Sequence, residues 1–300
     1  MLAKTSLLAG VVIGATLFAG RAHAQTEIAP EPSPHAADAM GEGGEEQLTL
    51  PKGRAVLNAF LEINLSSDAV GKPISLSPDV WYGVTDEITA GLVHSNAGAT
   101  GFMGAIGSGF TGNGASLCLA GSDNGCPDVY TGFGLEGRYK LKPAFGFTLV
   151  ADGGLYVRHL SDPFELSLKI GALGRWHKDK LAVELNPSLL IGITNRTQSQ
   201  TVGGVTLDVT LNDDVLFLPG TVLYTVAPQI DVMGQTGFFL PLEHTGDTYA
   251  IPLSVGASYH LNESVNLTLA LSLPRLIASS NGGQTGFDAR VLTLGGNYAF

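Results

Sequence analysis

Apolar and polar residues alternate in one segment after another from Arg54 onward, and this pattern constrains the fold more than any other feature. Successive side chains of a β-strand point to opposite faces, so alternation gives each strand one apolar and one polar face. In the first such segment Leu57 and Ile63 share one face, while Asn58 and Glu62 share the other. The pattern predicts an all-β chain with twelve strands, at roughly 54–65, 73–83, 87–96, 129–141, 144–159, 163–177, 180–194, 214–227, 229–243, 249–261, 265–276 and 286–300.

The connections between these segments fall into two sets. Every second link is a short turn, and the short set is 85–87, 142–143, 177–180, 227–228 and 262–264. The other set contains the long links, above all 96–128 and 195–213, although two of its members are short as well. Short periplasmic turns and longer outer loops are typical of transmembrane antiparallel up-and-down β-barrels, which have an even number of strands in bacteria. The sequence therefore predicts such a barrel, with about 12 strands and a range of about 10 to 14.

Composition and aromatic placement separate this prediction from a soluble β-sandwich or lipocalin-like barrel, which would also show alternation. Charged residues make up 14% of the chain, whereas soluble proteins carry about 25%. Aromatic side chains favour the membrane interface. They cluster near the predicted periplasmic strand ends and, in smaller number, near the outer ends: Tyr82, Tyr139, Phe145, Trp176, Tyr259, Tyr298 and Phe300, then Phe164, Phe287 and Tyr249.

The N-terminal region has the pattern of an exported protein. Lys4 precedes the apolar run 7–19, and Ala22-His23-Ala24 fits the small-x-small cleavage rule, so Gln25 is the predicted mature start. The next stretch is acidic and proline-rich with little apolar content, and we expect that nothing in it can pack. We interpret it as a disordered periplasmic tail, with a plug inside the barrel as the alternative. The predicted parts are a signal peptide (1–24), this periplasmic segment (25–52) and an outer-membrane barrel (53–300).

Charge and cysteine content narrow the classes of partner. The formal net charge of −11 argues against nucleic-acid binding, which needs a basic face. Cys118 and Cys126 are separated by seven residues in a chain predicted to be exported, so they predict a structural disulfide. No zinc, calcium or phosphate-binding motif appears, and we expect neither a metal nor a cofactor.

The polar faces of the strands predict the lining of the lumen. Twelve strands give an interior between the filled eight-stranded barrels and the open 16-stranded porins. Either this interior is a narrow channel for small polar solutes, in which the acid excess favours cations, or the charges pair across it and close it. In the second case the barrel is a structural or surface-interaction protein that uses its outer loops. The predicted inward charges are Glu62, Asp79, Glu136, Arg138, Asp152, Arg158, Glu165, Lys169, Arg175, Glu184 and Asp231.

The end of the chain supplies a resemblance. Leu292, Leu294, Tyr298 and Phe300 share one strand face, and this aromatic ladder resembles the closing strand of Gram-negative outer-membrane β-barrels. In that family the terminal Phe is an assembly signal, so the resemblance implies the barrel assembly machinery and outer-membrane lipid as partners. The segment 81–92 resembles a strand–turn–strand unit of putative outer-membrane transporters, including the phenol meta-pathway barrel family. This resemblance implies the fold and no substrate.

An enzyme is the third alternative. The segment Gly91-Leu92-Val93-His94-Ser95-Asn96-Ala97-Gly98 is similar to the His-x-Ser pattern of outer-membrane phospholipases and lipid A deacylases. In those barrels the His and the Ser share a strand face. Here His94 and Ser95 are adjacent and would point to opposite faces of a regular strand, which places them out of reach of each other unless a β-bulge intervenes. We therefore expect a protein that is not an enzyme.

Overall fold

The computed structural model describes residues 48–66, 72–104, 117–120, 129–160, 164–202, 205–210, 212–243, 249–279 and 286–300. The predicted signal peptide and most of the predicted periplasmic segment lie outside these residues. The chain consists of two compact units, Met1–Ser33 and Pro34–Phe300, and all the described residues belong to the second. No helix among the described residues is long and apolar enough to cross a bilayer.

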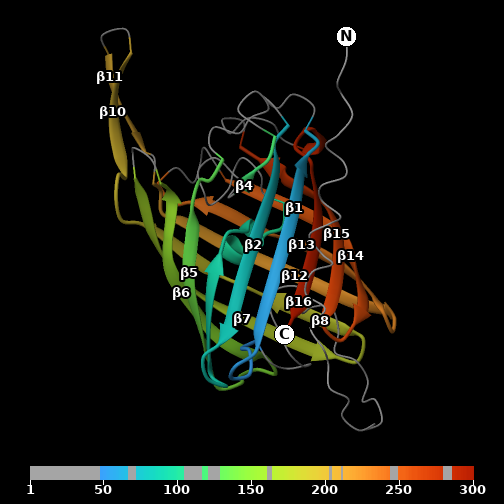
Figure 1. Ribbon diagram of the computed structural model, residues 1–300. Coiled ribbons are helices and arrows are strands. Elements are labelled where there is room, and N and C mark those ends of the chain that lie inside the picture. The colour runs from blue at the N-terminus through green and yellow to red at the C-terminus, as the bar shows by residue number, and fades with distance from the viewer. Residues whose placement is uncertain are drawn as a thin grey trace, which may run out of the picture. The chain divides into compact units, whose positions relative to one another are not determined.

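Twelve antiparallel strand positions close into a ring, as the alternation predicts (Figure 1). Each wall strand pairs with its neighbours in sequence order, and the ring closes where the first strand meets the last. The wall strands are β1 (Ala55–Asn64), β2 (Ile74–Gly83), β3 (Ile88–Val93), β5 (Phe133–Lys140), β6 (Thr148–His159), β7 (Glu165–Lys178), β8 (Leu181–Leu185) with β9 (Ser188–Gly192), β12 (Val215–Ala227), β13 (Ile230–Pro241), β14 (Ala250–Asn262), β15 (Val265–Ala278) and β16 (Val291–Ala299).

The seam between β1 and β16 runs in unbroken register from Val56 opposite Ala299 to Asn64 opposite Val291. Ala55 and Phe300 extend it by exchanging two backbone hydrogen bonds of 2.9 Å each. The rings of Tyr298 and Phe300 stack outside the seam with their centroids 5.6 Å apart. The predicted aromatic ladder thus lies on the closing strand, while its role in assembly stays a prediction.

One wall position is occupied by two short strands instead of one. The sequence predicts a single strand over 180–194, but β8 and β9 are separated at Asn186-Pro187. Proline has no backbone N–H to donate to a ladder, so it interrupts regular pairing. The two neighbouring strands bridge the break, because Pro187 O accepts from Ala172 N at 3.0 Å and Asn186 N donates to Pro219 O at 3.2 Å.

Four further elements were not predicted. They are a short strand β4 (Leu117–Cys118), a one-turn helix α1 (Asn96–Thr100), a hairpin of β10 (Thr197–Val202) and β11 (Val205–Thr210), and a 3-10 turn η5 (Gly286–Asp288). The hairpin extends beyond the barrel at the end opposite the short turns (Figure 1). Cys118 ends β4 and is buried, but Cys126 lies outside the described residues, so the disulfide stays a prediction.

The two faces of the wall have the predicted character only in part. Apolar outward side chains such as Leu135, Val255 and Leu269 are about half exposed and form a continuous apolar exterior. The inward face is not uniformly polar, contrary to the prediction. It also carries large buried apolar side chains: Val56, Phe60, Trp81, Val150, Leu173, Leu190, Val215 and Phe217. These residues pack against two segments of the chain that enter the barrel.

Candidate functional site

All eleven predicted inward charges lie on the buried face of the wall, and none is more than 8% exposed. They come from β1, β2, β5, β6, β7, β8 and β13, so alternation places them on one surface although they are far apart in sequence. The structure brings several of them together into pairs, and it joins others to polar side chains that the sequence did not single out.

Lys169 on β7 is the centre of the largest charged group. Its ammonium Nζ lies 2.8 Å from Glu136 Oε2 and 2.8 Å from Asp152 Oδ2, on β5 and β6. Tyr156 donates its hydroxyl to the same Glu136 oxygen. Arg138 Nε lies 3.8 Å from Glu136 Oε1, and its guanidinium sits 4.0 Å from the centre of the Trp81 ring. One ammonium thus compensates two buried carboxylates, and the group is fully shielded from water.

The other inward charges form smaller pairs around the wall. Arg175 Nε lies 2.9 Å from Glu184 Oε1 across the β7–β8 pairing. Asp231 Oδ2 lies 3.0 Å from His260 Nε2. Arg158 donates to Asn212 Oδ1 at 3.0 Å near the outer end of the barrel. Both ion pairs join neighbouring strands of the wall, so they are not the pairing across the lumen that the closed-lumen alternative requires.

Residues 95–104 enter the barrel, although the sequence predicts 96–128 as an outer loop. Asp79 on β2 anchors the entry point, because its Oδ1 accepts from the backbone N–H groups of His94 at 2.7 Å and Ser95 at 2.8 Å. The Ser95 hydroxyl donates to Asp79 Oδ2 and accepts from Gly98 N at 2.8 Å, so Ser95 is the N-cap of α1. We call residues 95–104 the inward segment.

The inward segment reaches the opposite wall. Gln235 on β13 accepts from Met103 N at 2.9 Å and donates to Gly101 O at 2.7 Å. Lys169 donates to Gly98 O at 3.3 Å, which links the segment to the charged group on β7. Partners on both sides of the ring hold the segment across the interior.

Glycine is required at two positions of this segment. Gly101 and Gly104 have φ of +77° and +69°, a region that L side chains rarely adopt. A Cβ on Gly101 would lie 2.7 Å from the Pro219 ring, and one on Gly104 would lie 2.5 Å from the Ser272 hydroxyl. The chain therefore fits into the barrel only because these positions lack side chains.

A second segment enters from the end with the short turns. Leu48, Thr49 and Leu50 are buried, so the prediction that nothing in 25–52 can pack is wrong for these residues. Leu48 packs with Val150 and Leu173, and Leu50 belongs to the same apolar cluster as Trp81. The apolar inward positions of the wall supply the partners that the sequence of the segment itself does not reveal.

Few polar contacts hold this second segment, which we call the N-terminal strap (residues 48–50). Leu50 N donates to Thr89 Oγ1 at 2.7 Å, and Thr49 Oγ1 donates to Asp86 O at 3.3 Å. Immediately after the strap, Lys52 N donates to Asp86 Oδ1 at 2.9 Å. All these partners lie on or beside the turn between β2 and β3.

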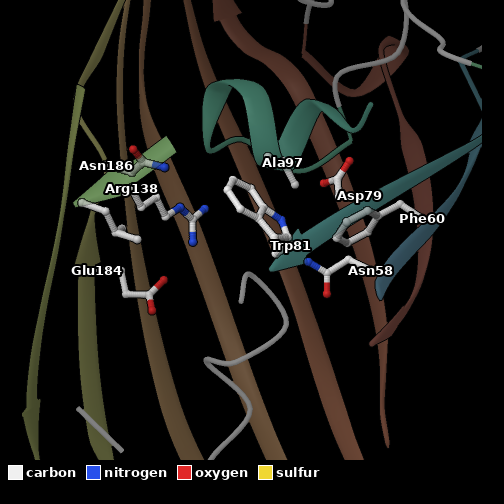
Figure 2. Close-up of a pocket in the computed structure, with 10 residues that line it drawn as sticks. Asn58, Phe60, Asp79, Trp81, Ala97, Arg138, Glu184 and Asn186 are labelled. Carbon is white, nitrogen blue, oxygen red and sulfur yellow. The ribbon is translucent and has the colours of Figure 1, made fainter. Parts of the chain in front are cut away.

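A narrow pocket lies beside α1 (Figure 2). Figure 2 shows the Trp81 ring and the Arg138 guanidinium lying beneath α1, with Glu184 and Asn186 on the neighbouring wall. The free space is about 10 Å³, which is room for about one water molecule. Among the described residues that line it, Asn186 has a buried Oδ1 without a hydrogen-bond partner. In this conformation the pocket is too narrow for a solute.

His94 and Ser95 do not form a catalytic pair. The His94 ring contacts Pro78 O through Nδ1 at 2.5 Å and the Tyr130 hydroxyl through Nε2 at 3.0 Å. The Ser95 hydroxyl donates to Asp79 and accepts from Gly98 N. Both residues position the inward segment, and within the described residues no group of three or more His, Cys, Asp or Glu side chains could hold a metal ion.

An ion-pair group lies outside the barrel wall at the base of the β10–β11 hairpin. Arg196 donates to both carboxylate oxygens of Asp214 at 2.7 and 3.1 Å, and it also contacts Glu243. Hydrogen bonding to Arg196 lowers the pKa of Asp214 below its ordinary value, and the same contacts raise the pKa of Arg196. The group ties the start of β10 to the ends of β12 and β13.

Several residues that shape the interior were not among the predicted site residues. Trp81, Gln235 and Asn186 hold the inward segment or line the pocket, and each occupies an inward position that alternation could have identified. A second sequence signal for segments inside the barrel is a strand that is apolar on both faces, as at Leu216-Phe217-Leu218. An inward apolar side chain such as Phe217 needs a partner inside the barrel.

No family model matches the chain, and no curated protein matches it. Among solved structures, it is similar to the NanC porin, with a TM-score of 0.52 and 11% identity over 81% of this chain and 98% of NanC. The KdgM porin, solved in complex with disordered oligogalacturonate, gives a TM-score of 0.46 and 10% identity over 82% and 99% of the two chains. The translocator domain of the autotransporter NalP from Neisseria meningitidis gives 0.42 and 11%, over 88% and 92%. The similarity to NanC, at 11% identity, shows that this chain shares the β-barrel fold of that protein.

Proposed function

We propose that the protein is a porin-like channel of the bacterial outer membrane for small polar solutes, and that the conformation described here is its closed state. The observation that carries this proposal is the pair of segments inside a charged wall. A barrel that serves only as a scaffold needs no chain segments in its interior, whereas a channel needs parts that can narrow and reopen a path.

The N-terminal strap is the part best suited to move. It is joined to the wall by the two polar contacts to Thr89 and Asp86 and by packing of Leu48 and Leu50. The inward segment is held more firmly, through Asp79 on one side and Gln235 on the other. Release of the strap would open the periplasmic half of the interior and leave the inward segment as the constriction.

Single-channel conductance in planar bilayers tests this proposal. We expect the mature protein to conduct rarely or in small steps, and a variant that lacks residues 25–50 to give larger and more frequent steps. The matched control is Leu48→Ala/Leu50→Ala, which keeps the length of the chain but removes its apolar anchors, and it should behave like the deletion. Absence of conductance from all three proteins, each shown to be folded and inserted, would refute the channel.

The second candidate function is a closed barrel that acts through its outer end. The narrowness of the pocket favours it, as does the β10–β11 hairpin beyond the wall. Absence of conductance in the bilayer experiment would favour this second candidate. An enzymatic role has less support, because His94 and Ser95 are both engaged in holding the inward segment.

A further inference from the structure

Glu62 is a buried acid to which the described part of the chain brings no positive charge. It lies on the inward face of β1 and is 4% exposed. The backbone N–H of Gly104 donates to it, and the nearby Asp79 adds negative charge. No described lysine, arginine or histidine forms an ion pair with it. An ionised carboxylate is costly to bury unless a positive charge compensates it.

Two hydroxyl groups flank Glu62 in the sheet. The β1–β2 register places Ser75 opposite Glu62, and the β1–β16 register places Thr293 opposite it on the other side. Residues opposite each other in antiparallel strands share a face, with Cβ atoms about 4.5 to 5.5 Å apart. The three side chains therefore form one inward row across the seam of the barrel, which we call the Glu62 row (Glu62, Ser75 and Thr293).

Both hydroxyls of the row are buried without a partner. Ser75 is 0% exposed and Thr293 is 1% exposed. Neither Ser75 Oγ nor Thr293 Oγ1 has a hydrogen-bond partner among the described residues, so neither hydroxyl donates to the carboxylate beside it. Buried polar groups without partners are rare in folded proteins and call for an explanation. A ligand that accepts lone pairs from all three side chains would explain the row.

The surroundings of the row supply no such ligand from the described part of the chain. The row continues to Ala270 on one side and to Cys118 on the other, and neither residue brings a positive charge. Met103, at the end of the inward segment, packs with Ala270 in an apolar cluster. The next residue, Gly104, contributes the N–H group that donates to Glu62. The row is thus an enclosed group of oxygen atoms with an uncompensated negative charge.

We propose that the Glu62 row binds a small monovalent cation such as sodium. Carboxylate and hydroxyl oxygens are hard ligands that suit hard cations. A single positive charge matches the single carboxylate of the row, because both carboxylate oxygens of Asp79 are engaged by His94 and Ser95. The ligands come from three strands and from distant positions, so no sequence motif reveals the site. The proposal goes beyond the channel function and does not depend on conduction.

Urea unfolding of the refolded mature protein in non-ionic detergent micelles tests the site. It is measured in sodium chloride and in the same concentration of N-methylglucamine chloride, whose cation is too large for the row. A ligand that binds only the folded state stabilises that state by mass action. At about ten times its dissociation constant, sodium should lower the unfolding equilibrium constant about 11-fold.

Two variants remove the site in different ways. Glu62→Gln keeps the size of the side chain and removes its charge, whereas Ser75→Ala/Thr293→Val keeps the charge and removes both hydroxyl ligands. Both variants should lose the response to sodium. The matched control is Glu184→Gln, because that inward carboxylate is already paired with Arg175, and this variant should keep the response. Each response compares two salts for one protein, so a change in basal stability does not imitate it.

Three results would overturn the proposal. Equal stability of the parent in the two salts would show that no cation binds, as is expected if the Glu62 carboxyl carries a proton instead. A full sodium response in either site variant would place the effect outside the row. Stronger stabilisation by calcium than by sodium at equal concentration would identify a divalent site. A failure of the channel proposal is distinct from all three, because unfolding is measured without current.

Discussion

Lys169 shows how one residue can decide whether the interior is stable. Its ammonium compensates Glu136 and Asp152, and both carboxylates are shielded from water. We expect Lys169→Met to lower the free energy of unfolding by about 3 to 5 kcal/mol, because removal of one partner leaves buried charges uncompensated. Urea unfolding in micelles, followed by tryptophan fluorescence, measures the change.

The control for this prediction is Lys178→Met, which removes an exposed cation from the same strand and should change stability little. The triple variant Lys169→Met/Glu136→Gln/Asp152→Asn should recover part of the loss, because it removes the carboxylate charges as well. A Lys169→Met barrel as stable as the parent would mean that water reaches this group.

Asp79 holds the entry point of the inward segment. Asp79→Asn keeps the size of the side chain but weakens the hydrogen bonds from His94 N and Ser95 N, which are charge-assisted. We expect larger fluctuations of single-channel current in this variant, because the entry point of the segment loosens. Glu165→Gln neutralises an inward acid that does not line the pocket beside α1, and it should leave the fluctuations unchanged. Equal current fluctuations in both variants would contradict the role assigned to Asp79.

At the scale of single elements, the β10–β11 hairpin depends on Arg196. The pKa of Asp214 is lower in the folded protein than in the unfolded chain, so the ion pair stabilises the fold above the ordinary pKa of about 4. This contribution is lost as the pH falls through the lowered value. We expect cleavage within 197–210 by an acid-active protease to rise between about pH 5 and about pH 2.

Arg196→Gln provides the control for the hairpin. Without the guanidinium the hairpin base lacks its ion pair at every pH. Cleavage should therefore be fast throughout the range, and its rate should no longer follow the protonation of Asp214. A parent protein that is cleaved equally fast at both ends of the range would show that the ion pair does not anchor the hairpin.

The elements also show what the sequence could predict. The twelve wall positions follow from alternation, which is local, and the predicted inward charges all occupy the buried face. The inward segment could not be predicted in this way, because its partners are distant: Met103 and Gln235 are 132 positions apart. The packing of the strap could not be predicted for a related reason, because Leu48 and Leu50 contact residues of β2, β6 and β7. Pro187 was a local signal for the break between β8 and β9.

At the scale of the whole molecule, the inward charge sets the expected ion preference. The predicted inward charges comprise seven acids and four bases, so the interior carries an excess of acidic residues. We expect the variant without residues 25–50 to prefer cations in a salt gradient. Glu165→Gln/Glu184→Gln should reduce this preference, whereas Glu263→Gln in a short turn should not. The reversal potential measures both effects, and an anion preference in the truncated protein would contradict the assignment.

The seam between β1 and β16 has a consequence for how the molecule forms. Neighbouring wall strands elsewhere are also neighbours along the chain, but Asn297 donates to Asn58 across 239 positions at 2.6 Å. Until that last pairing forms, β1 and β16 both expose unpaired backbone edges, which are templates for aggregation. Contacts between such distant positions also slow folding, because the entropy of loop closure opposes them. Two exposed edges must therefore avoid other chains until the two ends of this chain have met.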